Sequence, residues 1–177
     1  IRMVPDLYVA WHAGKSKWKN EKSLNYKSIG IEISNPGHEH GYKKFNEKQI
    51  KSIIRVTKVC IKKYKIKKKN ILGHSDIAPL RKIDPGEKFP WKFLNKNKIG
   101  VWHNINFKIL KSLRGKKSEN LYMFIIYLKN FGYNMEYTNS RELRKIIKIF
   151  QMRFRPELID GKLDAECYEI AKSLYNL

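Results

Sequence analysis

The stretch G-H-S-D-I-A-P-L-R-K-I-D-P-G, residues Gly73 to Gly86, is the most informative part of this sequence. His74 ends a short predicted strand, and a proline-bounded loop returns Asp84 ten residues later. Zinc binds an imidazole nitrogen and a carboxylate oxygen at roughly 2.0–2.2 Å, so a stiff loop can bring both ligands to one ion. The spacing also fits a histidine at a strand end and an aspartate in a turn, and by itself it does not separate the two interpretations.

Two charged side chains extend the metal-site hypothesis. Lys82 lies two residues before Asp84, so in an extended loop both side chains face the same way, and an ammonium group there can stabilise an oxyanion. Glu32 lies in the alternating stretch S-I-G-I-E-I-S, on the face opposite the isoleucines, where a carboxylate beside a metal can act as a general base. The alternatives, a surface lysine in a Lys-rich chain and a glutamate on a solvent-exposed strand face, stay open on these residues alone.

The first half of the chain alternates strand-like and helical patterns. Asn46 is expected to cap a helix, because Gln49 stands at the capping-box position and apolar residues then recur at helical spacing as far as Tyr64. The proline-rich segment that follows His74 is expected to be an ordered loop without regular structure. Extended segments are expected at residues 1–11, 28–34 and 70–74.

The second half is expected to be helical. Residues 91–115 show little pattern and are interpreted as a connection. Helical spacing returns from Leu121 to Phe131 and stops at Gly132, and Ser140 and Asp164 are each expected to cap one further helix. Three short amphipathic helices in succession predict a small bundle.

Composition limits the possible partners and chemistries. The 177 residues carry 38 Lys and Arg against 16 Asp and Glu, a formal net charge of +22, which favours an anionic partner. Nucleic acid is the usual first candidate, but the basic residues are mostly lysines dispersed along the chain. This distribution also suits anionic polymers of the cell envelope, and compositional bias of the encoding gene is an equally open explanation. No G-x-S-x-G, P-loop or H-E-x-x-H motif occurs. Cys60 and Cys167 form no C-x-x-C pair, so a thiolate zinc site and a disulfide are not expected.

The segment A-W-H-A-G-K-S, residues 10–16, follows the first extended segment. Its Trp11 and His12 are suited to line a cleft for a sugar or a peptide, although a tryptophan in an isolated fragment is more often a core residue. The other histidines, His38, His40 and His103, lie in loops and are not predicted to be ligands.

These motifs, in this order, resemble the type 2 N-acetylmuramoyl-L-alanine amidase family, which includes peptidoglycan recognition proteins. The resemblance is carried by A-W-H-A-G-K-S, L-N-Y-K-S-I-G-I-E-I-S-N, I-L-G-H-S-D-I-A-P-L-R-K-I-D-P-G and the F-P-W ending at Trp91. The later stretch F-Q-M-R-F-R-P, residues 150–156, resembles a peptidoglycan-binding three-helix module, an arrangement similar to that of the lipoprotein amidases.

The resemblance implies an α/β fold, with a mixed central β-sheet flanked by helices and followed by a small three-helix bundle. It implies a zinc amidase catalytic domain over residues 1–112 and a peptidoglycan-binding-like module over residues 113–177.

It also implies cleavage of the amide bond between the lactyl group of N-acetylmuramic acid and L-alanine. The implied roles are zinc ligands His74 and Asp84, general base Glu32, oxyanion stabiliser Lys82, and substrate-cleft residues His12, Asn35 and Trp11.

The family's metal site has a third protein ligand, a histidine on an earlier strand, and this chain has no matching residue. The third ligand is therefore expected upstream of Ile1, so the amidase domain is expected to be incomplete at its N-terminus, and an associated N-terminal fragment of the same protein is a possible partner. Peptidoglycan or muropeptides are the expected substrates, in the bacterial cell envelope or periplasm, with a cytoplasmic recycling role left open. No nucleic-acid partner is expected. The alternative is a non-catalytic peptidoglycan recognition protein.

Overall fold

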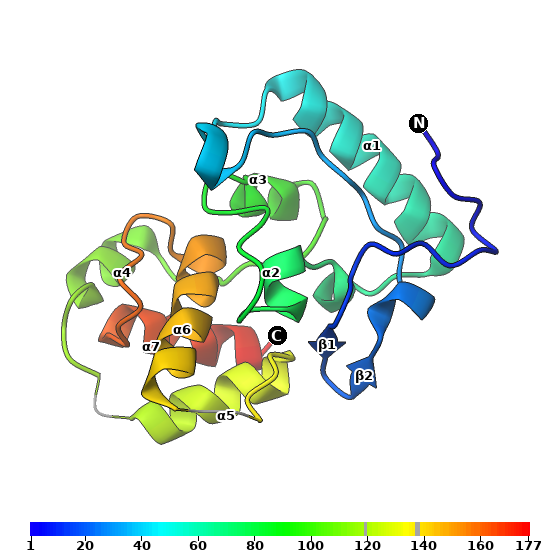
Figure 1. Cartoon of the computed structure of the whole chain (residues 1–177). Helices are drawn as coiled ribbons and strands as arrows, with labels where there is room; N and C mark the ends of the chain where they lie inside the picture. Colours follow the sequence, from blue (N-terminus) through cyan, green and yellow to red (C-terminus); the bar gives the residue numbers. More distant parts are fainter. Residues whose placement is uncertain (119, 137–138) are drawn as a thin grey trace.

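The computed structural model describes residues 1–118, 120–136 and 139–177, which form a mainly helical molecule (Figure 1). One strand pair lies near the N-terminal segment, and the last three helices pack together around the C-terminus. In chain order the elements are β1 Lys17–Trp18, β2 Glu21–Lys22, α1 Glu47–Tyr64, α2 His74–Ile77, α3 Trp91–Lys96, α4 Phe107–Leu113, α5 Leu121–Phe131, α6 Ser140–Phe154 and α7 Ala165–Tyr175.

The predicted strands at residues 28–34 and 70–74 are wrong. Within the described residues the sheet is limited to the antiparallel pair β1 and β2, in which Lys17 faces Lys22 and Trp18 faces Glu21. Residues 68–70 form a 3-10 turn instead, and His74 begins helix α2. An alternating apolar pattern becomes a strand only where a partner satisfies its backbone groups, and no described segment pairs with these two stretches.

The main helices follow the capping signals in the sequence. Asn46 caps α1 with the full capping box to Gln49, and Asp164 caps α7, both as predicted. Helix α5 also has its predicted bounds. The cap of α6 is Asn139, not Ser140. The region interpreted as a connection contains the short helices α3 and α4, which are too brief to give a clear periodic pattern.

Apolar side chains form two clusters. The smaller one lies between α1 and α3 and includes Ile50, Leu94 and the F-P-W aromatic Trp91. The larger one joins α5, α6 and α7 to the N-terminal part of the chain, because Trp18 of β1 packs edge-on against Phe131, with ring centroids 5.6 Å apart. The larger core is therefore continuous across the predicted boundary between residues 112 and 113, and the division into two domains stays a prediction.

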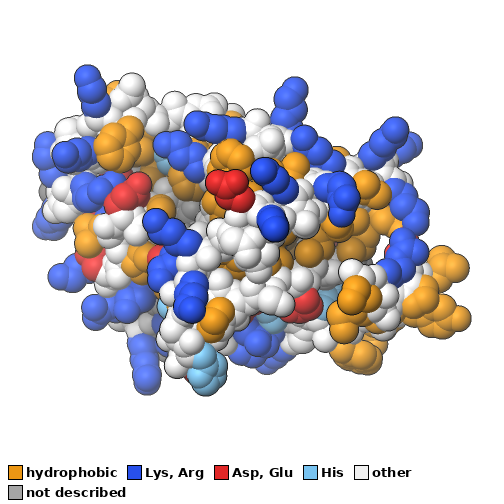
Figure 2. Space-filling view, turned by 90° about the horizontal axis from the view of Figure 1, so that it is seen from above, with side chains coloured by type: hydrophobic (Ala, Val, Ile, Leu, Met, Phe, Trp, Pro, Cys, Tyr) orange, Lys and Arg blue, Asp and Glu red, His pale blue; other side chains and the backbone are white. Residues whose placement is uncertain are grey.

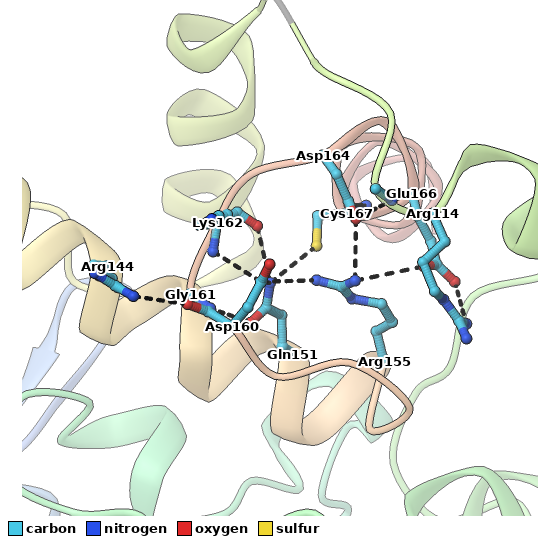
Figure 3. A network of polar contacts seen from close by, with 11 residues as sticks. Arg114, Arg144, Gln151, Arg155, Asp160, Gly161, Lys162, Asp164, Glu166 and Cys167 are labelled. Carbon is cyan, nitrogen blue, oxygen red and sulfur yellow. Dashed lines mark hydrogen bonds and ion pairs between the residues drawn. The ribbon is translucent and has the colours of Figure 1, made fainter.

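A buried charge network fixes the C-terminal helices to one another (Figure 3). Arg155, at the end of α6, is 1 % exposed, and its Nη1 donates to Asp164, the cap of α7, at 3.1 Å. Glu166 in α7 accepts two bonds of 2.7 Å from Arg114, which follows α4. Burial of these charges is costly unless each is paired, so the pairs hold α4, α6 and α7 in one arrangement.

Lys and Arg side chains are spread over the face seen in Figure 2 and do not form one patch. This agrees with their dispersal along the sequence. Apolar side chains gather at the edge where the N-terminal segment lies; Met3, Leu7, Tyr8 and Trp11 of that segment are each at least 71 % exposed. No helix in the described ranges is both long and apolar enough to cross a bilayer. Cys60 and Cys167 are both free thiols, as expected.

The fold is expected to weaken in acid, because His103 takes up a proton more readily in the unfolded chain than in the folded chain. Burial and the charge of Lys92 lower the pKa of His103 from 6.5 to about 4, so between these pH values the unfolded chain binds a proton that the folded chain does not. The free energy of unfolding therefore falls as the pH drops from 6.5 towards 4, by about 3 kcal/mol from this residue. Urea unfolding of the His103→Phe variant between pH 4 and 7.5 should show a correspondingly shallower fall. The same substitution at the exposed His40 is the control, and an unchanged pH profile for His103→Phe would contradict the expectation.

Candidate functional site

The structure brings the two predicted metal ligands together. His74 Nδ1 lies 3.1 Å from Asp84 Oδ2. The backbone closes the loop behind them, because the amide of Ser75 donates to the carbonyl of Asp84 at 2.8 Å. Two donors held at about 2.0–2.1 Å by a tetrahedral zinc ion would stand about 3.3 Å apart, close to the observed separation. The donor types and their spacing therefore fit zinc.

The carbonyl of Ala13 fixes the other side of the imidazole. His74 Nε2 lies 3.3 Å from this oxygen, so Nε2 is the ring nitrogen that faces the backbone and Nδ1 is the one on the side of Asp84. Metal-binding histidines commonly use their second nitrogen in this way to fix the ring. Arg81 Nη2 also donates to the Ala13 carbonyl, at 2.9 Å, and the Ala13 amide donates to the buried Asn25 Oδ1 at 2.7 Å. The A-W-H-A-G-K-S segment thus positions His74 through its backbone.

Gly73 allows the loop to return close to its start. A Cβ atom at this position would lie 2.7 Å from Cδ of Pro85, closer than packed atoms approach, and 3.4 Å from the Trp91 ring. The absence of a side chain lets the residue before His74 lie against the residue after Asp84. This close approach is what sets the distance between the two ligands.

The charges around Asp84 favour its ionised form. Partial burial acts to raise its pKa, but the hydrogen bond and charge of His74, together with the charge of Lys82, more than offset this, and the pKa lies below 3.8. A carboxylate, not a carboxylic acid, is the form that binds a metal. Lys82 is half-buried, and its charge is one of those that lower the pKa of Asp84; its role beside a metal stays a prediction.

Trp11 and His12 immediately precede Ala13, whose carbonyl contacts His74. Trp11 is 79 % exposed and stands edge-on to Tyr26, with ring centroids 6.1 Å apart. His12 is held by two contacts of 2.8 Å, one from Nδ1 to the Ala10 carbonyl and one between Nε2 and the hydroxyl of Ser28. An exposed tryptophan is available to a ligand, so Trp11 is not the core residue that the alternative interpretation allowed.

Within the described residues, no hydrogen bond or ion pair joins Glu32 or Asn35 to His74 or Asp84. Glu32 is exposed. Asn35 is used within its own loop, where its amide donates to the Lys43 carbonyl at 2.9 Å and its oxygen accepts from the Gly37 amide at 3.1 Å. The predicted catalytic role of Glu32 and the predicted substrate contact of Asn35 stay predictions.

Three residues that the sequence analysis did not single out support the site: Arg81, Asn25 and Asp76. Each lies inside a quoted motif, and each makes a specific bond to the backbone near His74. Asp76 alone had a recognisable signal, because it stands three residues after Gly73, the spacing of an acidic residue that accepts from the amide at a helix start. Arg81 and Asn25 have no such local signal.

No third ligand accompanies the pair. Across residues 1–118, 120–136 and 139–177, no group of three or more His, Cys, Asp or Glu side chains could hold a metal ion. The residues present therefore fit part of a zinc site, with the correct donor types for two of its positions.

Comparison with known proteins gives a consistent result. The profile of the family Amidase_2, described as N-acetylmuramoyl-L-alanine amidase, matches residues 1–87. N-acetylmuramoyl-L-alanine amidase AmiD of Escherichia coli (strain K12) is 37 % identical over 182 residues, which cover 98 % of this chain and 66 % of AmiD. The 1,6-anhydro-N-acetylmuramyl-L-alanine amidase AmpD of Haemophilus influenzae is 42 % identical over 84 residues, covering 47 % of this chain and 44 % of AmpD. The chain thus spans two thirds or less of the length of these relatives.

Solved structures confirm the expected fold class. The complex of Escherichia coli AmiD with the substrate anhydro-N-acetylmuramic acid-L-Ala-D-gamma-Glu-L-Lys superposes with a TM-score of 0.87 at 36 % identity, covering 99 % of this chain and 72 % of that one. AMPDH3 from Pseudomonas aeruginosa gives the same TM-score at 32 % identity and the same coverage. The likeness includes the C-terminal helices as well as the region around His74.

The segment that carries Glu32 is expected to be coupled to His12. A Cβ atom at Gly30 would lie 2.6 Å from the His12 ring, so Gly30→Ala should reduce the free energy of unfolding by about 1–3 kcal/mol through overpacking. In a His12→Ala background the ring is gone and most of this cost should disappear. Chemical denaturation of both single variants and the double variant measures the coupling. Additive losses would show that Gly30 does not pack against His12.

Proposed function

The chain belongs to the N-acetylmuramoyl-L-alanine amidase family, and from this premise we propose that it hydrolyses the amide bond between the lactyl group of N-acetylmuramic acid and L-alanine. The observation that carries the proposal is the 3.1 Å separation of His74 Nδ1 and Asp84 Oδ2, with the second imidazole nitrogen directed at a backbone carbonyl. The likeness to an AmiD structure containing a muramyl peptide supports peptidoglycan or muropeptides as the substrates.

His74 and Asp84 would hold a zinc ion. Bound there, zinc supplies a Lewis acid for the scissile carbonyl and lowers the pKa of water. Glu32 removes a proton from the attacking water and can return it to the leaving amide nitrogen. Lys82, already near Asp84, stabilises the negative charge that develops on the carbonyl oxygen. Trp11, His12 and Asn35 contact the sugar or the stem peptide.

A third protein ligand completes the site in this proposal. The described residues bring two donors together, and we propose that the remaining ligand is a histidine supplied by another segment of the protein or by an associated fragment. The exposed apolar side chains of the N-terminal segment and the 40 % exposed Ile31 offer a surface for such a segment. We propose the cell envelope or periplasm as its location, because intact peptidoglycan lies there; hydrolysis of recycled muropeptides would instead occur in the cytoplasm.

A peptidoglycan-binding protein without hydrolytic activity is the second candidate. It is favoured by the finding of two, not three, converging metal donors in the described residues. Against it, His74 and Asp84 are held close together and the charge of Lys82 acts on Asp84. A protein that only binds peptidoglycan does not require this arrangement.

Chelator-sensitive release of stem peptide from muropeptides separates the two candidates. Activity should be lost on removal of metal and restored by Zn²⁺, and His74→Ala or Asp84→Ala should abolish it. Glu32→Gln should lower kcat by about 10²–10⁴-fold as a lost general base, and Lys82→Ala by about 10²–10³-fold as a lost oxyanion contact.

The matched controls are Glu39→Gln and Lys44→Ala, two exposed residues of the neighbouring loop, which should leave kcat unchanged. Binding of muropeptides without release of peptide, in protein that contains the upstream segment and Zn²⁺, would establish the non-catalytic alternative. Full activity of Glu32→Gln would show that another group acts as the base.

A further inference from the structure

In addition to the ion pairs of Arg114 and Arg155, a buried ion pair joins Asp76, two residues after His74, to Arg153. Asp76 belongs to helix α2 and is 1 % exposed, and Arg153 belongs to helix α6 and is 3 % exposed. Arg153 Nη1 donates to Asp76 Oδ2, and the hydroxyl of Tyr133, just after α5, donates to Asp76 Oδ1 at 2.6 Å. Both donors therefore come from the C-terminal helical unit, defined here as residues 113–177.

Asp76 is also hydrogen-bonded to the backbone next to His74. Its Oδ2 also accepts from the amide of Gly73 at 2.7 Å, which fixes the first turn of α2. His74 is the first residue of that turn, and Ser75, the next residue, donates its amide to the Asp84 carbonyl at 2.8 Å. The carboxylate of Asp76 thus lies one residue from the contact that holds Asp84 and two residues from His74.

Arg153 is itself held in a fixed orientation. Its Nη2 donates to the Ile71 carbonyl at 3.1 Å, in the segment that leads into His74, and its guanidinium stacks 4.2 Å from the centre of the Trp91 ring. A planar guanidinium that donates in two directions and stacks on an aromatic ring has one orientation, which a lysine ammonium cannot reproduce. The pair therefore defines the position of α2 as well as neutralising a buried charge.

Resting on the proposed function, we propose that Arg153 and Tyr133 are positioning residues for the metal ligand His74, acting through Asp76. In this arrangement the C-terminal helical unit is part of the catalytic site's framework, in addition to any role in binding polymer. A buried ion pair is weak evidence for stability, because an apolar replacement is often as stable. Apolar residues in place of Asp76 and Arg153 could not accept the hydrogen bond that the Gly73 amide donates to Asp76. They would also lack the positive charge of Arg153 that compensates the carboxylate.

The chain offers matched control residues. Arg155 lies two residues after Arg153, is 1 % exposed and is equally ion-paired, but its carboxylate partners Asp160, Asp164 and Glu166 all belong to the C-terminal helical unit (Figure 3). Tyr127 is a buried tyrosine of the same unit whose ring lies against those of Tyr168 and Tyr175 in α7. Substitutions at the control positions disturb the helical unit without touching the turn that carries His74.

The experiment compares Arg153→Lys with Arg155→Lys, and Tyr133→Phe with Tyr127→Phe, in the full chain. Two quantities are measured: the dissociation constant for Zn²⁺ in competition with a chromogenic chelator, and the ¹⁵N shifts of the His74 imidazole in metal-free protein. The thermal unfolding midpoint of each variant reports its stability. Arg153→Lys and Tyr133→Phe should weaken Zn²⁺ binding about 10- to 100-fold, as changes behind a metal ligand do, and should shift the His74 signals. The controls should do neither, even where they lower the midpoint equally.

Equal effects of each variant and its control on both quantities would overturn the inference, because stability alone would then explain them. Tyr133→Phe removes one hydroxyl and keeps the ring, so it gives a result even if Arg153→Lys fails to fold. Zn²⁺ binding that is unchanged in His74→Ala would instead refute the proposed metal site. The His74 shifts in metal-free protein would then decide the positioning inference by themselves.

Discussion

The close approach of Gly73 to Pro85 is the constraint on which the candidate site depends. The two residues flank His74 and Asp84, and a Cβ atom at Gly73 would lie 2.7 Å from the proline ring. Because the ends of the loop are in contact, the imidazole and the carboxylate are brought to 3.1 Å without a strand or a long helix to hold them. The loop is rigid through packing and backbone bonds, which places functional groups more accurately than a free loop does.

Such a loop needs support from outside, and the structure supplies it from two directions. On one side, the A-W-H-A-G-K-S segment presents the Ala13 carbonyl to both His74 and Arg81. On the other side, Asp76 is held by Arg153 and Tyr133 from the C-terminal helices. The imidazole is therefore oriented through its Nε2 atom and through the backbone of its own residue at the same time.

The sequence predicted those features that depend on local signals. Caps and helical spacing located α1, α5 and α7. The proline-bounded loop allowed His74 and Asp84 to meet, and only the family resemblance implied that they would. The sequence failed where structure depends on distant partners. The expected strands lack a described partner, so their alternating pattern did not become a sheet. The bond from Tyr133 to Asp76 spans 57 residues and that from Arg153 spans 77, and neither leaves a local pattern by which it can be found.

The shared core bears on what the C-terminal helices do. A module that only tethers an enzyme to its polymer is usually joined by a linker and a modest polar interface, and moves relative to the enzyme. Here Trp18 packs against Phe131 and Tyr133, with ring centroids 5.6 and 5.4 Å apart, inside one continuous apolar cluster. Separation of the two parts would expose this cluster and leave the charge of Asp76 without its partner, both of which are costly. The loop with His74 and the C-terminal helices are therefore expected to move as one body, and a polymer bound to those helices, as proposed, would be held in a fixed orientation relative to His74 and Asp84.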